Sequence, residues 1–433
     1  MSALHPHPRR IVVVGGGVAG LILATRLGRT LGATGRAAIT LVDRSPTHLW
    51  KPMLHTIAAG TWNAYQQQVQ YLTHARAHHF SYVPGELDGI DRAARRIHLA
   101  PIRLEGETVA EARELAYDAL VLALGSSAND FGTPGVNEHC HWIDSQEQAD
   151  AFNRRLRAHV ARSFVSGNHI DVAIVGGGAT GVELAAEMSR MVELAASYGT
   201  ETGIRQRLRL TLLEGAPRIL NAFPEAISIL ASTQLRALGI DVRAGVRVMA
   251  ADAEGFVLES GERINATLKV WAAGIRAADG IAGSGLELNK LGQVVVTPSL
   301  LANGEDCIFA IGDCASLVLQ DAERPLPSTA QVANQQALHL ARHLPAWLSG
   351  RQVPPFSFRD FGALVSLSDY NAFGTLGRFG FFRGGFIRGR FAQLSHALLY
   401  RNHQLSLHGP GRALLLWVAE RINALVNPKI RIS

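Results

Sequence analysis

Cysteine is scarce in this chain of 433 residues, which has only three of them. The number is odd, and Cys140, Cys307 and Cys314 form no CxxC or CxxxxC pair. We therefore expect neither a framework of disulfides nor a dithiol redox centre. Such sparse usage is typical of proteins from a reducing compartment.

Long apolar runs are lacking as well. No stretch approaches the roughly 20 apolar residues that a membrane-spanning helix needs, so we expect no spanning helix. The first residues, MSALHPHPRR, contain no apolar segment of the kind found in signal peptides. Hydrophobic residues nevertheless make up 47% of the chain and charged residues 18%, which is the composition of a globular protein. The length predicts two or three domains.

Acidic residues are almost absent from the last part of the sequence. Residues 377–433 hold nine Lys or Arg but a single acidic residue, Glu420, which gives them a net charge of +8. The rest of the chain has a net charge of −2. A nearly neutral body with a basic tail indicates attraction to an anionic surface.

The tail also shows amphipathic periodicity. One predicted helical stripe contains Ile387, Phe391, Leu394 and Leu398. A second predicted helix has an apolar face, a polar face and Trp417 at the edge; the apolar face is Leu414, Leu415, Val418, Ile422, Leu425 and Val426, and the polar face is Arg412, Glu420, Asn423 and Asn427. Apolar stripes flanked by Arg and Trp are typical of helices that lie in a membrane surface. Packing on the body or on a second subunit is the main alternative, and nucleic-acid binding is disfavoured.

Glycine, in contrast, is abundant, with 43 residues. Two segments share one design of strand, glycine-rich turn, helix and second strand. The first runs from the strand Arg10–Val14 to the strand Ala38–Asp43, and its turn carries Gly15, Gly17 and Gly20. The second runs from Ile170–Val175 to Leu208–Glu214, and its turn carries Gly176, Gly178 and Gly181.

This GxGxxG spacing has a physical purpose in dinucleotide binding. The first Gly permits the tight turn, the second lets the backbone approach a pyrophosphate, and the third lets helix and strand pack closely. The start of the helix then offers free N–H groups to the phosphates. A single GxGxxG is a weak signal, but two copies, each followed by a strand that ends in an acidic residue, predict two nucleotide-binding units.

We assign FAD to the first unit, because it begins the chain and is matched by a distant Gly-Asp pair, Gly312 and Asp313. Ala123 and Gly125, at the end of the apolar stretch Tyr117–Gly125, are further candidates for cofactor contacts. The second unit would then hold the nicotinamide nucleotide, together with Gly274 at the end of the strand Leu268–Gly274.

The acidic residues that end the second strands predict the nucleotide partners. Asp43 is expected to bond the adenosine ribose of FAD, and Glu214 the ribose of NAD. A carboxylate at Glu214 repels a 2′-phosphate, which favours NADH over NADPH. Arg218 is close enough in sequence to weaken that preference, although a solvated surface charge is the simpler interpretation.

Three polar residues are candidates for the chemistry. Glu183 follows Gly181 by two residues, where a carboxylate either stabilises the first turn of the helix or lies near the reacting rings. Gln331 and Gln335 are spaced to share one face of a predicted helix, and they either face solvent or bond a quinone carbonyl. No metal site and no catalytic triad is indicated, since hydride transfer is the chemistry of the cofactors.

At this point the chain resembles the type II NADH:quinone oxidoreductases, the single-subunit respiratory NADH dehydrogenases. The matching motifs are LWKP at 49–52, GGGATGVELAAE at 176–187, VWAAG at 270–274, AIGDCA at 310–315, AQVANQ at 330–335 and LLYRNHQLSLHG at 398–409. The last of these is similar to the bacterial respiratory branch. Asn334 and Thr56 stand where many relatives have His and Glu.

The resemblance implies a pyridine nucleotide-disulfide oxidoreductase-like α/β fold with non-covalent FAD. It also implies that NADH reduces a membrane quinone, ubiquinone or menaquinone, without proton pumping. Gln331 and Gln335 would line the quinone site, Glu183 would lie near the nicotinamide, and Lys51 would contact a cofactor. The protein would dock peripherally on the cytoplasmic face of the inner or plasma membrane, with a homodimer left open.

The expected architecture is two Rossmann-like domains and a helical tail. Residues 8–137 and 290–376 would form the FAD-binding domain, 138–289 the NADH-binding domain, and 377–433 membrane-surface helices. Three rival functions remain: a soluble flavoprotein that reduces a small redox protein, a sulfide:quinone oxidoreductase, and an NAD-sensing flavoprotein without turnover. The second needs paired reactive cysteines, whereas Cys314 beside the Gly-Asp pair is better interpreted as a small buried residue.

Overall fold

The computed structural model describes residues 8–62, 68–197, 204–278, 280–320, 322–368, 371–379, 382–388 and 390–426. The chain forms two compact units. Unit 1 consists of Met1–Leu49, Gln67–Ser127 and Ile275–Phe358, and unit 2 of Trp50–Gln66, Ala128–Gly274 and Arg359–Ser433. The chain thus changes unit after Ser127 and Gly274, rather than after residues 137 and 289 as predicted, and residues 50–66 join unit 2.

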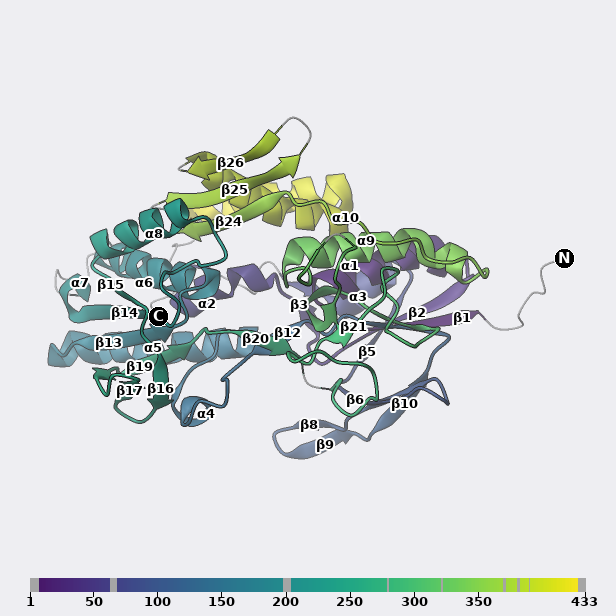
Figure 1. Ribbon diagram of the computed structural model, residues 1–433, viewed down its shortest axis with the longest axis horizontal. Coiled ribbons are helices and arrows are strands. Elements are labelled where there is room, and N and C mark those ends of the chain that lie inside the picture. Colours follow the sequence, from purple (N-terminus) through teal and green to yellow (C-terminus); the bar gives the residue numbers. More distant parts are fainter. Residues whose placement is uncertain are drawn as a thin grey trace. The chain divides into compact units, whose positions relative to one another are not determined.

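Unit 1 is built on a parallel sheet of five strands in the order β22-β11-β1-β2-β5 (Figure 1). Its central strand is buried from Ile11 to Val14, as expected for an apolar strand of a parallel sheet with neighbours on both sides. Helix α1 (Val18–Leu27) leaves this strand through the first glycine turn and packs against α9 (Ala330–Trp347). The strands of the sheet are β1 (Arg9–Val14), β2 (Ala37–Asp43), β5 (Ser81–Pro84), β11 (Ala119–Leu122) and β22 (Ile308–Ala310).

Smaller elements surround this sheet. A π-helical turn (Gly28–Gly32) extends α1, and an antiparallel sheet has the order β10-β7-β6. The remaining elements assigned to this unit, wholly or in part, are β3 (Thr47–His48), β4 (Val69–Gln70), α3 (Tyr71–Ala77), β6 (Leu87–Asp91), β7 (Arg96–Leu99), β8 (Ile102–Leu104), β9 (Glu107–Ala110), β10 (Arg113–Ala116), β12 (Ser126–Ala128), β20 (Ile275–Ala277), β21 (Val294–Val295), the 3₁₀ turn η4 (Gly312–Cys314) and β23 (Ala315–Ser316).

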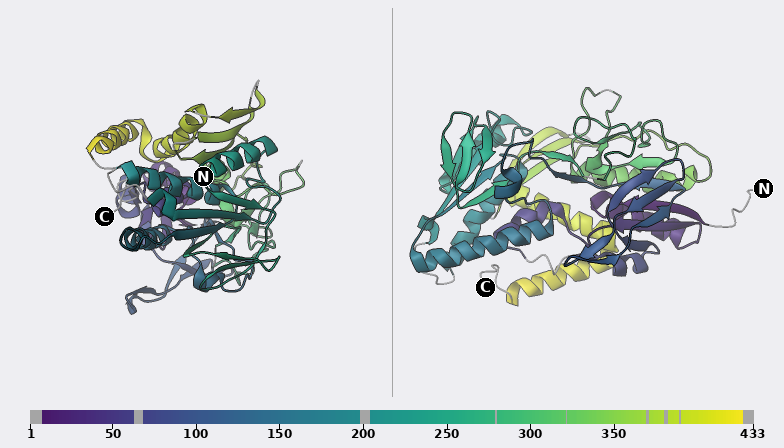
Figure 2. Two further views of the ribbon diagram at one scale, coloured as in Figure 1. Left: turned by 90° about the vertical axis from the view of Figure 1, so that its left-hand side faces the viewer. Right: turned by 90° about the horizontal axis from the view of Figure 1, so that it is seen from below.

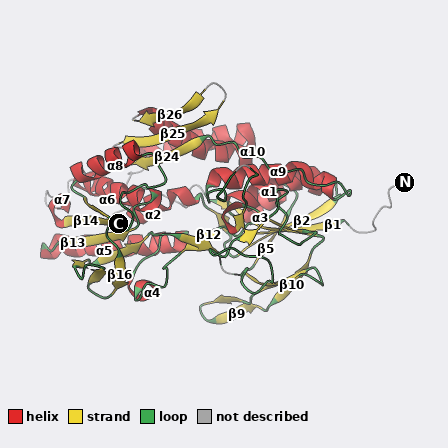
Figure 3. Ribbon diagram, in the orientation of Figure 1, coloured by secondary structure: helices red, strands yellow, loops and turns green. Residues whose placement is uncertain are grey.

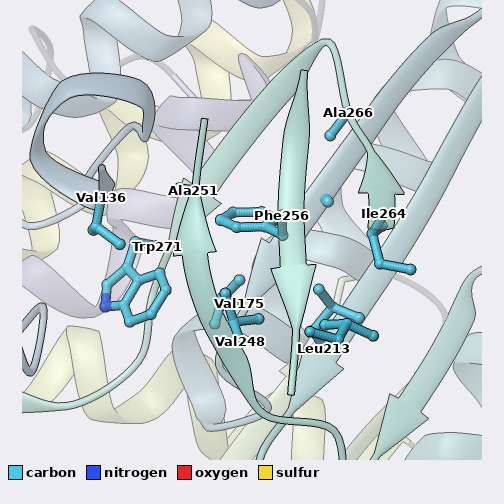
Figure 4. Close-up of a cluster of buried hydrophobic side chains, with 11 residues drawn as sticks. Val136, Val175, Leu213, Val248, Ala251, Phe256, Ile264, Ala266 and Trp271 are labelled. Carbon is cyan, nitrogen blue, oxygen red and sulfur yellow. The ribbon is translucent and has the colours of Figure 1, made fainter. Parts of the chain in front are cut away.

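Unit 2 repeats the design with a parallel sheet of four strands in the order β15-β14-β13-β19. Helices α5 (Gln146–Ser166) and α6 (Ala179–Ser197) contact its strand β13 (Figure 3). A buried cluster that includes Leu213, Phe256 and Trp271 joins the sheet to an antiparallel meander (Figure 4). The strands are β13 (Ile170–Val175), β14 (Leu208–Glu214), β15 (Asp241–Ala244) and β19 (Leu268–Trp271), and the meander is β16 (Val248–Ala251), β17 (Gly255–Leu258) and β18 (Arg263–Asn265).

The rest of unit 2 is helical, except for an antiparallel sheet near the end of the chain with the order β24-β25-β26. Its elements are the 3₁₀ turn η2 (Lys51–Met53), α2 (Leu54–Ala59), α4 (Val136–His139), α7 (Ile204–Arg207), α8 (Glu225–Ala237), β24 (Gly362–Leu367), β25 (Asn371–Phe379), β26 (Phe382–Arg388) and α10 (Arg390–Val426). The predicted boundary after residue 376 is wrong, because it falls inside β25, which is paired on both sides. Ile387 lies in β26 and not on a helix.

Helix α10 is two helices joined by a break at Gly409, which has φ 76° and ψ 170° and precedes Pro410 (Figure 2). Contacts cross the break between residues 13 to 19 positions apart, so the two halves fold back on each other as a helical hairpin. Gln404 accepts a hydrogen bond from the indole of Trp417 at 2.8 Å and donates one to Glu420 at 3.0 Å. Arg401 pairs with Glu420.

Candidate functional site

The three fingerprint glycines of unit 1 each meet one physical requirement. Gly15 has φ of +102°, and a Cβ on it would overlap the carbonyl of Ala123. A Cβ on Gly20 would overlap the carbonyl oxygen of Gly15, so α1 can start close to β1 only with glycine here. A Cβ on Gly17, the N-cap of α1, would meet nothing within 4 Å. The free N–H groups of the helix are therefore open to a phosphate.

Gly16, between the first two fingerprint glycines, is contacted by polar groups at both its N–H and its carbonyl. The N–H of Gly16 donates to Oδ2 of Asp43 at 2.5 Å, and the N–H of Ser45 donates to Oδ1 at 2.8 Å. The carbonyl of Gly16 accepts a hydrogen bond from the hydroxyl of Tyr71 at 2.7 Å and lies 2.9 Å from Nδ1 of His48. Both of these side chains are buried. No motif in the sequence indicated Tyr71 or His48, because both lie outside the motifs.

The Gly-Asp pair lies in the same unit and is also tightly bonded. The N–H of Gly312 donates to Oε1 of Gln336 at 2.7 Å. The hydroxyl of Ser126 donates to Oδ2 of Asp313 at 2.8 Å, and Gln293 donates to the carbonyl of Asp313 at 2.8 Å. Gln293 and Gln336 are buried amides that the sequence motifs did not indicate, although Gln336 lies on the same helix as Gln331 and Gln335.

Helix α9 carries the predicted quinone residues. Gln331 and Gln335 are half-buried on it, one helical turn apart, as the spacing predicted. Between them, Oδ1 of Asn334 is buried and accepts no hydrogen bond from the residues that the structure describes. The hydroxyl of Ser127, also in unit 1, is likewise buried and has no hydrogen-bond partner among the described residues.

Unit 1 fits FAD on these observations. The space over Gly17 and over Gly125, which has φ of +74°, admits a ligand against the backbone. Asp43 ends β2, where a dinucleotide-binding unit is expected to carry the carboxylate that bonds a ribose. The unpartnered oxygens of Asn334 and Ser127 have the character of atoms that a bound group satisfies.

Unit 2 reproduces the glycine geometry of unit 1. Gly176 has φ of +113°, and a Cβ on it would come within 2.6 Å of the carbonyl of Ala272. A Cβ on Gly181 would overlap the carbonyl oxygen of Gly176, whereas Gly178 has open space. Glu214 accepts hydrogen bonds from the N–H groups of Gly177 at 2.5 Å and Ala216 at 2.6 Å. This is the arrangement of Asp43 in the other unit.

Arg218 neither faces solvent freely nor is available to a 2′-phosphate. Its guanidinium donates to the carbonyls of Leu220, Asn221 and Phe223 and to the hydroxyl of Ser228, at 2.5 to 3.3 Å. The expectation of a solvated surface charge is therefore wrong, because this side chain ties the loop after β14 to the start of α8. Arg218 therefore does not offset the repulsion that Glu214 would exert on a 2′-phosphate.

Glu183 is buried on α6, with its side chain among polar groups. It is the fifth residue of the helix, so the predicted role of stabilising the first turn is wrong. One carboxyl oxygen accepts a hydrogen bond from the N–H of Ser366 at 3.0 Å, and the other lies 3.5 Å from Nδ1 of His55. One turn further on, Glu187 accepts a hydrogen bond from Thr61.

The pKa of Glu183 is raised to about 8, mainly by burial and with a smaller contribution from the charge of Glu187, against the opposing effect of the hydrogen bond from Ser366. The carboxyl is therefore expected to be largely protonated at neutral pH, with Nδ1 of His55 at 3.5 Å from its second oxygen. A buried carboxylic acid that titrates near the working pH is suited to proton transfer.

The remaining predicted residues have partners of their own within unit 2. The ammonium of Lys51 donates to Asp144 at 3.0 Å, and its predicted cofactor contact stays a prediction. Thr56 is buried and donates to the carbonyl of Met53 at 2.6 Å. A Cβ on Gly274, which follows β19, would overlap the ring of Phe131.

The C-terminal hairpin has several exposed apolar side chains. Leu398, Leu414, Leu415, Val418 and Ile422 are each about half or more exposed. Trp417, expected at the edge of this face, is instead half-buried with its indole bonded to Gln404. The side chains of Phe391, Leu394, Leu425 and Val426 and all of Asn427 lie outside what the structure describes. Among the described residues, no helix has the length and apolarity that crossing a bilayer requires.

All three cysteines are free. Burial raises the pKa of Cys140 and Cys307 to about 12 and that of Cys314 to about 11. The Cys314 thiol is fully buried against the carbonyls of Leu122 and Ile311. Thiols of this kind are inert, which agrees with the interpretation of Cys314 as a packing residue.

Known proteins of similar sequence and fold agree with this geometry. Residues 9–337 match the family described as pyridine nucleotide-disulphide oxidoreductase. The chain is 37% identical over 444 residues to a type II NADH:quinone oxidoreductase of Haemophilus influenzae, covering 98% of this chain and 100% of that protein.

Two solved structures share the fold at 18% identity. NDH2 from Plasmodium falciparum in complex with NADH superposes with a TM-score of 0.83, covering 98% of this chain and 100% of that one. The sulfide:quinone oxidoreductase of Aquifex aeolicus superposes with a TM-score of 0.73, covering 98% and 96%. The fold is thus shared between different activities, and the sequence match decides between them. The chain belongs to the FAD-binding type II NADH:quinone oxidoreductases.

Proposed function

We propose that this protein is a respiratory NADH dehydrogenase that passes electrons from NADH to a membrane quinone without pumping protons. NADH binds at the glycine turn of unit 2, and FAD binds non-covalently at that of unit 1. When bound, FAD accepts the hydride and hands two electrons to the quinone. The observation that carries this proposal is the pair of matching glycine turns, each with its carboxylate, Asp43 or Glu214.

Glu214 and Arg218 support selectivity for NADH. The carboxylate of Glu214 stands at the ribose position of a Rossmann unit, where it accepts hydroxyl hydrogens and repels a phosphate. The four hydrogen bonds of Arg218 hold its guanidinium on backbone carbonyls and Ser228. Losing them to bind a 2′-phosphate would leave several acceptors without donors.

Glu183 is the group that we assign to proton delivery. Quinone reduction to quinol consumes two protons, and hydride transfer from NADH supplies only one of them. A buried carboxylic acid with a pKa of about 8 is protonated at neutral pH and can donate. The neighbouring Glu187, bonded to Thr61, lies one helical turn along the same face.

Gln331 and Gln335 are the proposed partners of the quinone carbonyls. They are half-buried one turn apart on α9, with the unpartnered Oδ1 of Asn334 between them in sequence. Gln331→Leu is expected to slow quinone reduction about tenfold and to leave flavin reduction by NADH unchanged, since one neutral hydrogen bond to the acceptor is lost. Stopped-flow measurement of each half-reaction checks this, and equal slowing of both would refute the assignment.

The hairpin of α10 is the proposed membrane contact. Its exposed leucines lie in the segment with a net charge of +8, and each basic residue near an anionic leaflet contributes on the order of 1 kcal/mol. This arrangement fits peripheral attachment to the cytoplasmic face of the inner or plasma membrane. A soluble reductase of a small redox protein has no use for such a surface.

The deciding experiment is NADH-driven reduction of a soluble quinone analogue, combined with flotation on anionic liposomes. The intact protein is expected to be yellow, to turn over NADH and quinone, and to float. Leu414→Glu with Val418→Glu is expected to abolish flotation and keep turnover, whereas the control Leu72→Glu, at an exposed leucine of unit 1, keeps both. Colourless protein, or protein that ignores quinones, would overturn the proposal.

A further inference from the structure

An aromatic residue of unit 2, Phe131, combines a left-handed backbone conformation with an exposed ring. Its φ of 54° is left-handed, a region that bulky side chains avoid because it is sterically costly. The side chain is 63% exposed, so burial of the ring does not offset this cost. Strain of this kind persists only where the surroundings impose it, and it clusters at ligand sites.

The surroundings of Phe131 impose its conformation through a set of hydrogen bonds. Its N–H donates to Oδ1 of Asn129 at 2.9 Å, and the next N–H donates to Oδ1 of Asp130 at 3.0 Å. Asn137 on α4 donates to the other oxygen of Asp130 at 2.7 Å. The indole of Trp271 donates to the carbonyl of Asn129 at 2.9 Å, which anchors the turn to the end of β19. Figure 4 shows Trp271 in the core cluster beside Val136, the first residue of α4.

The ring lies against the backbone just after β19. A Cβ on Gly274 would come within 2.5 Å of Cε2 of Phe131, so the ring occupies the space that any other residue at position 274 would fill. Two residues earlier, the carbonyl of Ala272 packs against Gly176 of the glycine turn. The ring is therefore fixed at the carboxyl edge of the sheet, beside the nucleotide-binding turn.

The order of strands says which part of a dinucleotide this ring meets. In the sheet β15-β14-β13-β19, the glycine turn for the pyrophosphate follows β13, and Glu214 for the adenosine ribose ends β14. The nicotinamide half extends from the pyrophosphate in the opposite direction, over β19. Phe131, whose ring lies against Gly274 just after β19, is on that side.

We propose that Phe131 is a substrate-contacting residue that stacks on the nicotinamide half of NADH. The inference rests on the proposed use of NADH and adds a specific contact to it. A flat ring held in advance by Asn129 and Gly274 loses little freedom on binding, so the stacking energy goes into affinity. Offset stacking adds up to about 1.5 kcal/mol beyond simple burial, which corresponds to roughly tenfold in the dissociation constant.

The test measures NADH binding to the intact holoenzyme, from the NADH dependence of anaerobic flavin reduction and from the long-wavelength absorbance of the enzyme–nucleotide complex. Phe131→Ala is expected to raise the dissociation constant about tenfold and to weaken that absorbance. Phe131→Tyr keeps the ring and is expected to stay within about twofold of the wild type, whereas Phe131→Leu keeps the bulk and should behave as the alanine variant. Phe164→Ala, at another exposed phenylalanine of unit 2, is the control.

Two results would overturn the inference: wild-type affinity in Phe131→Ala, or full recovery by Phe131→Leu, which would make the ring a packing group. The leucine and tyrosine variants keep the question open to test even if the alanine variant folds poorly. Failure of the proposed quinone activity is separately visible, because the wild-type protein would then bind NADH and reduce its flavin without reducing quinone.

Discussion

The glycine turns of the two units match position by position. Gly15 and Gly176 both have left-handed φ values, of +102° and +113°, and each faces the carbonyl region of a neighbouring strand end. Asp43 and Glu214 each accept two backbone N–H groups. The match shows that a short local sequence is enough to set the turn, whichever nucleotide it serves.

The groups that contact the carbonyl of the following residue, Gly16 or Gly177, differ between the units. In unit 1 the carbonyl of Gly16 is held by the side chains of Tyr71 and His48. In unit 2 the carbonyl of Gly177 accepts the backbone N–H of Leu220 at 2.7 Å. The turn of unit 1 is thus braced by buried side chains, and the turn of unit 2 by a backbone N–H.

The helices after the turns differ more. Two residues beyond the third glycine, α1 has Ile22, which is fully apolar and buried, whereas α6 has Glu183. Nucleotide binding does not need a carboxyl there, because α1 has none in its first turn or at Ile22. The difference supports the proposal that Glu183 serves the chemistry and not nucleotide binding.

The largest effect on nucleotide binding is expected when a methyl group is added to one glycine turn and the other turn is left unchanged. Gly20→Ala is expected to reduce bound flavin at least about tenfold, because the new Cβ overlaps the carbonyl oxygen of Gly15. Gly181→Ala is expected to keep the flavin and lower NADH affinity by about a hundredfold. Flavin absorbance and NADH titration measure the two effects, and Gly89→Ala, where a Cβ has ordinary contacts, is the control. Loss of flavin in both variants would show that the two turns are not independent.

Glu183→Gln is expected to slow quinone reduction by about a hundredfold, the usual contribution of a positioned acid. In the wild type the rate is expected to fall above pH 8, tenfold per pH unit, as the carboxyl ionises. The variant should lose this fall, and Glu183→Ile, which copies α1, should behave alike. A pH profile of the quinone half-reaction decides, and an unchanged profile in the glutamine variant would refute the role.

The same carboxyl links stability to pH. Its folded pKa of about 8 lies above its ordinary value of 4.5, so the folded protein keeps a proton that the unfolded chain releases. Stability is therefore expected to decrease as the pH rises from about 4.5 to about 8. Denaturant titrations across this range should show a smaller decrease in Glu183→Gln.

A smaller change is expected in nucleotide preference. Glu214→Ala should shift the NADH-to-NADPH preference by about tenfold toward NADPH, since repulsion of the 2′-phosphate is removed. Arg218→Ala should leave the preference unchanged and lower the melting temperature, because the guanidinium bonds the protein itself. The ratio of kcat/KM for the two nucleotides measures this. A drop in NADPH use in Arg218→Ala would contradict the structural role.

The smallest effect is expected from Tyr71→Phe. It removes one hydrogen bond to Gly16, while His48 remains beside the same carbonyl. FAD is expected to bind about fivefold more weakly, as for loss of one neutral hydrogen bond, with NADH affinity unchanged. Titration of the deflavinated protein with FAD gives the number. Equal FAD affinity would mean that His48 alone braces the turn.

The sequence predicted the elements whose pattern is local. The strands Ile170–Val175 and Leu208–Glu214 are confirmed residue for residue, and the helix with Gln331 begins at Ala330 as expected. Both glycine turns are confirmed in geometry, because their backbone requirements are written in a few consecutive residues. The roles of the site residues stay predictions.

What the sequence did not predict depends on distant partners. Ile387 fits a helical stripe by spacing, but pairing with β25 makes its segment a strand. Arg218 is read as a surface charge until the loop carbonyls around it are known. The bracing of Gly16 by Tyr71 joins residues 55 positions apart, and no local pattern reports such a contact.

The high pKa values of the three thiols have a consequence for durability. Thiolates, and not thiols, react with peroxide and alkylating agents, and at neutral pH these cysteines are almost wholly protonated. Reduced flavins produce peroxide in air, so we expect these thiols to be oxidised slowly. Treatment with iodoacetamide should leave turnover intact.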